Sequence, residues 1–186
     1  IAFAKLGVTS ALVNTSQTGK VLAHSINLVK PVAIVVGEEC RVAVDEIRQD
    51  LAIQPENFHW FADQETQKDA GKAPKGYINL AEVLEQFPKF NVPTTHSVKG
   101  KDGLFYIYTS GTTGLPKAVI FSNSRWTLAY GTYGHVLNLN EDDVMYCTLP
   151  LYHATGMVVC WCGAIAGSSA FAIRRKYSTS AFWTDV

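Results

Sequence analysis

The sequence predicts an α/β fold with a mainly parallel sheet flanked by helices. Short apolar runs alternate with segments of helical spacing through the 186 residues. Residues 8–13 and 32–36 are expected to be buried strands, and residues 19–29 and 39–51 the helices that follow them. Strands that alternate with helices favour parallel pairing, so ligand loops are expected at the carboxyl ends of the strands.

The second part of the chain continues this alternation with two polar interruptions. Residues 58–62 predict another strand, and residues 63–76, rich in Gln, Lys, Asp and Gly, an exposed connector. Helical spacing returns at 77–87, and a second connector at 88–102 leads to an apolar strand at 104–108. Neither connector is long enough to require a domain boundary, so we expect one domain.

The run that follows this last strand carries the clearest chemical information. It consists of Tyr106, Ile107, Tyr108, Thr109, Ser110, Gly111, Thr112, Thr113, Gly114, Leu115, Pro116 and Lys117. Glycines allow the backbone N–H groups to approach anionic oxygens closely, and the four hydroxyls add donors. Lys117 adds a flexible positive charge, and a helix beginning near Ser122 would place its positive amino end close by. The run therefore predicts a loop that binds nucleotide phosphates.

Two familiar nucleotide motifs do not match this run. The Walker pattern has four residues between its glycines and Ser or Thr after the lysine. Here two residues separate Gly111 from Gly114, and Ala118 follows Lys117. The dinucleotide fingerprint needs a third glycine in register, which the run lacks. A bare Gly-x-x-Gly is usually a surface loop, but the full twelve-residue run favours phosphate binding.

Several segments resemble one enzyme family. Residues 108–117 resemble the phosphate-loop signature of the adenylate-forming (AMP-binding) superfamily, and residues 149–156, Leu-Pro-Leu-Tyr-His-Ala-Thr-Gly, resemble its next motif. Residues 174–183 resemble the "RKFSASxFW" segment of very-long-chain acyl-CoA synthetases and fatty acid transport proteins. Residues 5–14 and 22–26 are similar to the same branch, so the resemblance covers essentially the whole chain.

The resemblance implies that residues 1–186 are part of the large N-terminal domain of an adenylate-forming enzyme. The family's "YGxTE" and "TGD" segments, which carry an acidic residue for magnesium and the aspartate for the ribose, do not occur in this sequence. The C-terminal lid domain, with its catalytic lysine, is also absent, and Ile1 is not an initiator methionine. We therefore expect a fragment that is inactive alone.

For the parent protein, the resemblance implies a fatty-acid–CoA ligase of fatty acid metabolism and transport. It would use ATP, Mg²⁺ and CoA to make an acyl adenylate and then an acyl-CoA. Residues 109–113 would hold the β- and γ-phosphates, Lys117 would offset the charge of the leaving pyrophosphate, and His153 would donate to the carboxylate or acyl phosphate. Gly156 would permit close substrate approach. A non-catalytic nucleotide-binding remnant, and an adenylating ligase with another acid or acceptor, stay open as alternatives.

Charge and cysteine content bear on partners and location. Sixteen basic and sixteen acidic side chains balance, so the sequence predicts no broad basic surface for nucleic acid. Cys40, Cys147, Cys160 and Cys162 lie in apolar contexts without framework spacing, which fits a reducing, cytoplasmic location. No second pair accompanies Cys160 and Cys162, so buried small side chains are favoured over half of a metal site.

Residues 156–173 contain no charged side chain, and eighteen residues is the minimum length for a membrane span. The cluster Gly167, Ser168 and Ser169 instead favours a turn between a buried helix and a buried strand. The resemblance leaves peripheral membrane association of the parent protein open.

Aromatic residues and the remaining histidines receive structural interpretations. Trp126, Tyr130 and Tyr133 recur at helical spacing, which favours core packing over a platform for stacked bases. Four histidines show no ligand spacing: His24, His59, His96 and His135.

Overall fold

The computed structural model describes residues 1–62, 72–110 and 114–186. The chain divides into two units. Unit 1 comprises Ile1–Asn14, Val92–Tyr108 and Val119–Val186, and unit 2 comprises Thr15–Asn91 and Thr109–Ala118.

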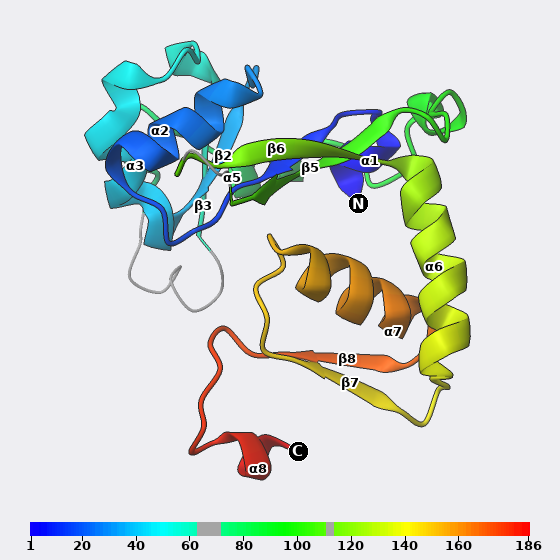
Figure 1. The fold of residues 1–186 in the computed structure, drawn as a ribbon. Helices are drawn as coiled ribbons and strands as arrows, with labels where there is room; N and C mark the ends of the chain where they lie inside the picture. The colour runs from blue at the N-terminus through cyan, green and yellow to red at the C-terminus, as the bar shows by residue number, and fades with distance from the viewer. Residues whose placement is uncertain (63–71, 111–113) are drawn as a thin grey trace. The chain divides into compact units, whose positions relative to one another are not determined.

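Unit 2 contains a small parallel sheet in the order β2-β3-β4, formed by β2 (Ile34–Gly37), β3 (Phe58–Phe61) and β4 (Ile78–Asn79). The helices α2 (Gly19–Leu28) and α3 (Arg41–Ile47) lie side by side next to this sheet (Figure 1). Apolar side chains of these elements form its core: Leu22, Ile26, Val36, Val44, Ile47, Phe58 and Trp60. The predicted strand–helix alternation is confirmed in this unit.

Two predicted helices of unit 2 are shorter than expected. The 39–51 segment is α-helical only in α3, between the 3-10 turns η1 (Glu38–Cys40) and η2 (Arg48–Asp50). In the 77–87 segment, residues 78 and 79 pair with β3, so α5 (Leu80–Glu85) starts later. Asn79 sets that start because its Oδ1 accepts hydrogen bonds from the N–H groups of Ala81 (3.1 Å) and Glu82 (3.4 Å).

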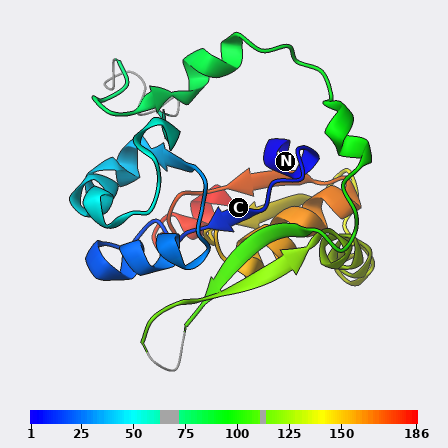
Figure 2. The ribbon, with the colours of Figure 1, turned by 90° about the horizontal axis from the view of Figure 1, so that it is seen from above.

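Unit 1 begins with α1 (Ala2–Lys5) and β1 (Ser10–Leu12), and a further 3-10 turn, η4 (Pro93–His96), precedes its central strand. That strand, β5 (Gly103–Thr109), lies between β1 and β6 (Lys117–Ser122). β1 runs parallel to β5, with Ser10 opposite Phe105 and Leu12 opposite Ile107. β5 and β6 are hydrogen-bonded neighbours in this three-stranded sheet, and the two green strands lie side by side in Figure 2.

The rest of unit 1 is built around α6 (Asn123–Leu137), which lies alongside α7 (Cys162–Gly167) and the parallel pair β7 (Val144–Cys147) and β8 (Ala170–Ile173) (Figure 1). Gly163 permits this approach, since a Cβ there would lie 2.6 Å from Leu137 Cδ1. The chain ends with α8 (Phe182–Asp185), where Asp185 accepts from the Tyr146 hydroxyl at 2.6 Å and pairs with Arg174.

The mainly parallel character is confirmed in the four registered strand pairs, β1–β5, β2–β3, β3–β4 and β7–β8. The described strands form three separate sheets instead of one continuous sheet. The sequence pattern did not identify β6 or β7. Exposed apolar residues, Val119 and Ile120 in β6 and Val144 in β7, mean that neither strand shows the clean alternation of a half-buried strand.

The uncharged segment 156–173 contains the predicted turn between a helix and a strand, but the strand β8 is half-buried to exposed, so its predicted burial is wrong. A π-helix, η5 (Thr155–Trp161), continues into α7, and Ser168 turns the chain with φ of 57° before β8. Across the described ranges, no helix combines the length and apolar character that crossing a membrane requires.

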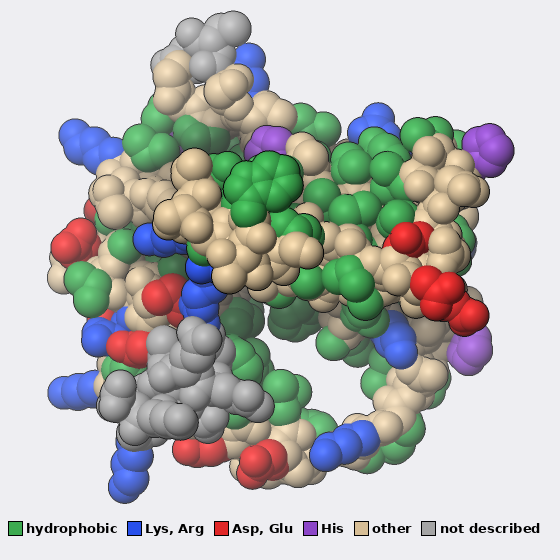
Figure 3. Space-filling view, turned by 90° about the horizontal axis from the view of Figure 1, so that it is seen from below, with side chains coloured by type: hydrophobic (Ala, Val, Ile, Leu, Met, Phe, Trp, Pro, Cys, Tyr) green, Lys and Arg blue, Asp and Glu red, His purple; other side chains and the backbone are tan. Residues whose placement is uncertain are grey.

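Core packing accounts for two of the three aromatic side chains on α6. Trp126 contacts the rings of Phe105 and Trp161, with centroids 5.9 and 5.5 Å away, and Tyr133 packs on the same core cluster. Tyr130 is 44% exposed, so core packing is the wrong interpretation for that residue. On the face drawn in Figure 3, basic and acidic side chains are interspersed among hydrophobic and other polar ones.

Candidate functional site

The sequence-predicted phosphate loop joins β5 to β6. Gly111, Thr112 and Thr113 lie outside the described residues. Thr109 and Ser110 are exposed where β5 ends, and their hydroxyls are available as donors. Gly114 has φ of 82°, and a Cβ there would meet nothing within 4 Å. Glycine is therefore required at this position for the left-handed backbone and not for space.

Lys117 is exposed as the first residue of β6. Helix α6 begins at Asn123, capped by Ser122, whose Oγ accepts the N–H of Arg125 at 3.4 Å. The predicted helix start is thus confirmed, but its proximity to the loop is wrong. Six residues of strand separate the loop from the helix, and a strand of that length spans about 20 Å. The positive charge next to the loop comes from the Lys117 ammonium, because helix-dipole effects fall off within one turn.

The strand before the loop presents two different faces. Tyr106 and Tyr108 are half-buried and, two residues apart, point to the same side of β5. Burial raises the pKa of the Tyr108 hydroxyl to about 12, and Tyr106 contributes in the same direction. Tyr108 therefore remains protonated at neutral pH. Ile107 is 8% exposed and belongs to the core cluster with Phe105 and Val158, so its side chain packs in the core.

A histidine outside the predicted site contacts the carboxyl end of the loop. The Nε2 atom of His24, on α2, lies 3.1 Å from the carbonyl oxygen of Pro116. His24 and Pro116 are both half-buried, and both belong to unit 2. This pair could not be predicted from the sequence, because 92 residues separate its members and His24 lies at an ordinary helical position.

The second predicted site residue, His153, belongs to unit 1 and is exposed. Its backbone N–H donates to Pro150 O at 3.1 Å, and its Nδ1 accepts the backbone N–H of Thr155 at 3.2 Å. Because Nδ1 accepts, the neutral ring carries its proton on Nε2. His153 can therefore donate a hydrogen bond from Nε2 without a change of protonation state.

Gly156 serves packing. It is buried in η5, and a Cβ there would lie 2.5 Å from Pro150 O and 3.0 Å from Leu149 O. The backbone of residues 149 and 150 occupies the space that a side chain would need. The sequence-based expectation explained this glycine by close substrate approach. The structure explains it by packing against the backbone of residues 149 and 150.

Three cysteines lie close to this segment as free thiols. Cys147 and Cys162 are buried, as the sequence predicts, and Cys160 is half-buried. Burial, and then the neighbouring Cys147, raise the pKa of Cys160 to about 11. Thiols with raised pKa are poor nucleophiles and poor metal ligands at neutral pH.

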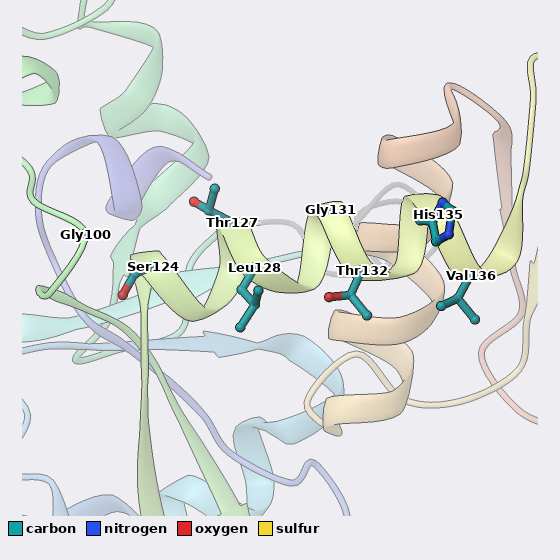
Figure 4. Close-up of a pocket in the computed structure, with 8 residues that line it drawn as sticks. All are labelled: Gly100, Ser124, Thr127, Leu128, Gly131, Thr132, His135 and Val136. Atoms are coloured by element: carbon teal, nitrogen blue, oxygen red, sulfur yellow. The ribbon is translucent and has the colours of Figure 1, made fainter.

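A groove of about 820 Å³ runs along α6 and past Gly100. Figure 4 shows Leu128, Thr132 and Val136 on the side of the helix that lines it. Their spacing of four residues places them on one helical face. Leu128 and Val136 are 71% and 68% exposed, and the lining includes neither Lys117 nor His153.

Comparison with known proteins identifies the class of protein to which this fold and loop belong. The chain matches the family described as "AMP-binding enzyme" over residues 1–186, and it belongs to that family.

Two curated relatives of this chain are named for fatty acids. Long-chain fatty acid transport protein 6 of Mus musculus is 34% identical over 185 residues, covering 98% of this chain and 28% of the relative. Medium/long-chain-fatty-acid–CoA ligase FadD6 of Mycobacterium tuberculosis is 30% identical over 191 residues, covering 100% of this chain and 29% of the relative. The chain thus spans less than a third of either relative.

A solved structure shows the same fold. The inhibitor-bound N-terminal domain of FACL13 from Mycobacterium tuberculosis superposes with a TM-score of 0.72 at 19% identity, covering 98% of this chain and 42% of that one. The predicted fold, part of the large N-terminal domain of an adenylate-forming enzyme, is confirmed.

Proposed function

We propose that this chain carries the ATP phosphate loop of a fatty-acid–CoA ligase. The observation that carries the proposal is the set of exposed residues Thr109, Ser110, Gly114 and Lys117 on the connection between β5 and β6, in a chain that matches the AMP-binding enzymes throughout. The named activity of the M. tuberculosis relative, a medium/long-chain-fatty-acid–CoA ligase, supports a fatty acid as the acid substrate.

In the proposed reaction, a carboxylate oxygen of the fatty acid bonds to the α-phosphorus of ATP. The bond from that phosphorus to the oxygen bridging to the β-phosphate breaks, and pyrophosphate leaves. The thiolate sulfur of CoA then attacks the acyl carbon, and AMP leaves with the bonding electrons. Negative charge accumulates on the departing pyrophosphate in the first step, and fixed donors and cations stabilise such charge.

The described residues have distinct tasks in this scheme. Thr109 and Ser110 donate hydroxyl hydrogen bonds to the β- and γ-phosphate oxygens, and Gly114 gives the loop its left-handed turn. Lys117 offsets the charge of the leaving group. His153 donates from Nε2 to the carboxylate or the acyl phosphate, with its ring oriented by the Thr155 N–H.

Magnesium requires oxygen ligands, usually carboxylates and phosphates. Among the residues that the structure describes, no group of three or more His, Cys, Asp and Glu side chains could hold a metal ion. The described hydroxyls of Thr109 and Ser110 do not make a magnesium site by themselves. In the proposed function, Mg²⁺ therefore arrives with ATP, bound to its phosphates.

The test is fatty-acid-dependent exchange of labelled pyrophosphate into ATP by the complete gene product, with acids of increasing length, with and without CoA. Exchange that needs a fatty acid, with acyl-CoA formed when CoA is present, supports the ligase. Exchange with a different acid or acceptor would replace the substrate. A folded, ATP-binding protein that shows no exchange would favour a non-catalytic nucleotide-binding protein.

A further inference from the structure

His24 holds the phosphate loop at the residue before Lys117. Its Nε2 lies 3.1 Å from Pro116 O. A carbonyl oxygen only accepts hydrogen bonds, so Nε2 must carry the proton and donate. The contact joins helix α2 to the carboxyl arm of the loop within unit 2.

The geometry of the peptide bond extends this contact to Lys117. The Pro116 carbonyl oxygen lies in one plane with the amide nitrogen and Cα of Lys117. The proline ring also restricts φ on the other side of that plane. A hydrogen bond that holds Pro116 O therefore limits the direction in which the Lys117 side chain leaves the backbone.

The donor sits on a well-anchored helix. Ala23 and Ser25, the neighbours of His24 on α2, are both buried. Near the other end of α2, Asn27 Nδ2 donates to Asp50 O at 2.7 Å, and Asn27 Oδ1 accepts the Ala52 N–H at 3.1 Å. α2 thus offers a fixed support for the carboxyl arm of the loop.

We propose that His24 is a positioning residue for Lys117, orienting the ammonium toward the leaving pyrophosphate through the Pro116 carbonyl. This role rests on the proposed function of the loop. It assigns a task to a histidine that contacts no reacting group itself.

The kinetic test uses the complete gene product with three His24 variants. His24→Ala and His24→Leu remove the donor, and Leu also fills much of the ring's space in case the alanine variant fails to fold. Both should slow fatty-acid-dependent pyrophosphate exchange by about 2- to 10-fold, the range for one net hydrogen bond. The effect should fall on kcat with the KM for fatty acid unchanged, because Lys117 acts on charge that develops during the reaction. His24→Gln should recover most of the rate, since its amide can donate to the same carbonyl.

Asn27→Ala is the matched control, because it removes hydrogen bonds of the same helix that do not reach the loop. It should lower stability and leave kcat unchanged. If Asn27→Ala slows exchange as much as His24→Leu at matched folded fraction, or if His24→Gln recovers nothing, the positioning role is wrong.

A second readout does not depend on activity. Amide hydrogen exchange in a peptide covering residues 114–118 should be faster in His24→Leu than in the unmodified protein or Asn27→Ala. If the unmodified protein shows no pyrophosphate exchange, the proposed function fails, and this amide measurement still decides whether His24 holds the loop. Equal amide exchange in all three proteins would overturn the inference.

Discussion

Two glycine-containing segments of the chain show why the same residue type is needed for different reasons. In the phosphate loop, Gly114 adopts φ of 82° in open space, so the backbone conformation requires glycine. In η5, Gly156 has its missing Cβ directed at Pro150 O, 2.5 Å away, so packing requires glycine. Gly114 is exposed, whereas Gly156 is buried and fixes the chain next to His153. A glycine in a motif is therefore not evidence of ligand contact until its surroundings are known.

Substitution of Lys117 should have the largest effect on activity. It tests whether the phosphate loop acts in the reaction while the segment around Gly156 acts in packing. Lys117→Ala should slow adenylation by about 10- to 1000-fold, the usual loss for one electrostatic contact in a transition state. Stability should change little, because Lys117 is exposed. The measurement is pyrophosphate exchange together with thermal unfolding. Lys20→Ala, at another exposed lysine of unit 2, is the control. An unchanged exchange rate in Lys117→Ala would show that the lysine has no role in adenylation.

Substitution of Gly156 should act on stability first. Gly156→Ala places a methyl group against backbone oxygen and should lower the free energy of unfolding by roughly 1–3 kcal/mol, the range for overpacking. Gly131→Ala is the matched control on α6, since nothing lies within 4 Å of a Cβ there. That change should be neutral or stabilising by about 0.5–1 kcal/mol. Urea unfolding of both variants is the measurement, and equal stability of the two would contradict the packing explanation.

Substitution of Gly114 should have a smaller effect, through backbone conformation alone. Gly114→Ala should disfavour the left-handed turn by about 1–2 kcal/mol and raise the KM for ATP accordingly. Gly114→Asn should cost less, since asparagine tolerates this region better than alanine. Steady-state kinetics with varied ATP would rank the three proteins. If alanine were no worse than asparagine, the left-handed conformation would not be what the loop needs.

Alkaline pH should lower the stability of the folded protein. The pKa of Cys160 is raised from 9.0 to about 11, and those of Tyr77 and Tyr108 from 10.0 to about 12. In each case the folded state keeps a proton that the unfolded state loses at lower pH. The free energy of unfolding should therefore fall as pH rises from about 9 to 12.

Urea unfolding at successive pH values measures this slope. Tyr108→Phe should flatten it between pH 10 and 12, because one of the shifted groups is removed. A stability that rises with pH in this window would contradict the assigned direction.

The alternation of strands and helices could be predicted from the sequence because each central strand is a short apolar run with a residue in a core. Val36, Phe58 and Ile107 all lie in cores, and their segments fold as predicted. Strands β6 and β7 were missed because tertiary pairing, and not their own pattern, makes them strands. The start of α5 was misplaced because two residues of the helical pattern pair with β3 instead.

The candidate site was readable where the chemistry is local. Hydroxyls, glycine and lysine within one short run predict a phosphate loop without knowledge of the fold. The contact of His24 with Pro116 O joins positions 92 residues apart. The tight packing of Gly156 against Pro150 O depends on a π-helix, which the amino-acid composition does not predict. Long-range placement of this kind appears only after the chain has folded.

The most direct test of the loop's role is protection of Lys117 by nucleotide. In the complete gene product, lysine acylation rates can be followed residue by residue by mass spectrometry, with and without saturating ATP and Mg²⁺. We expect ATP to slow acylation of Lys117 several-fold and to leave Lys20 unaffected, because the phosphates cover only the loop lysine. Equal acylation of Lys117 in the presence and absence of bound ATP would contradict the claim that this loop holds the nucleotide.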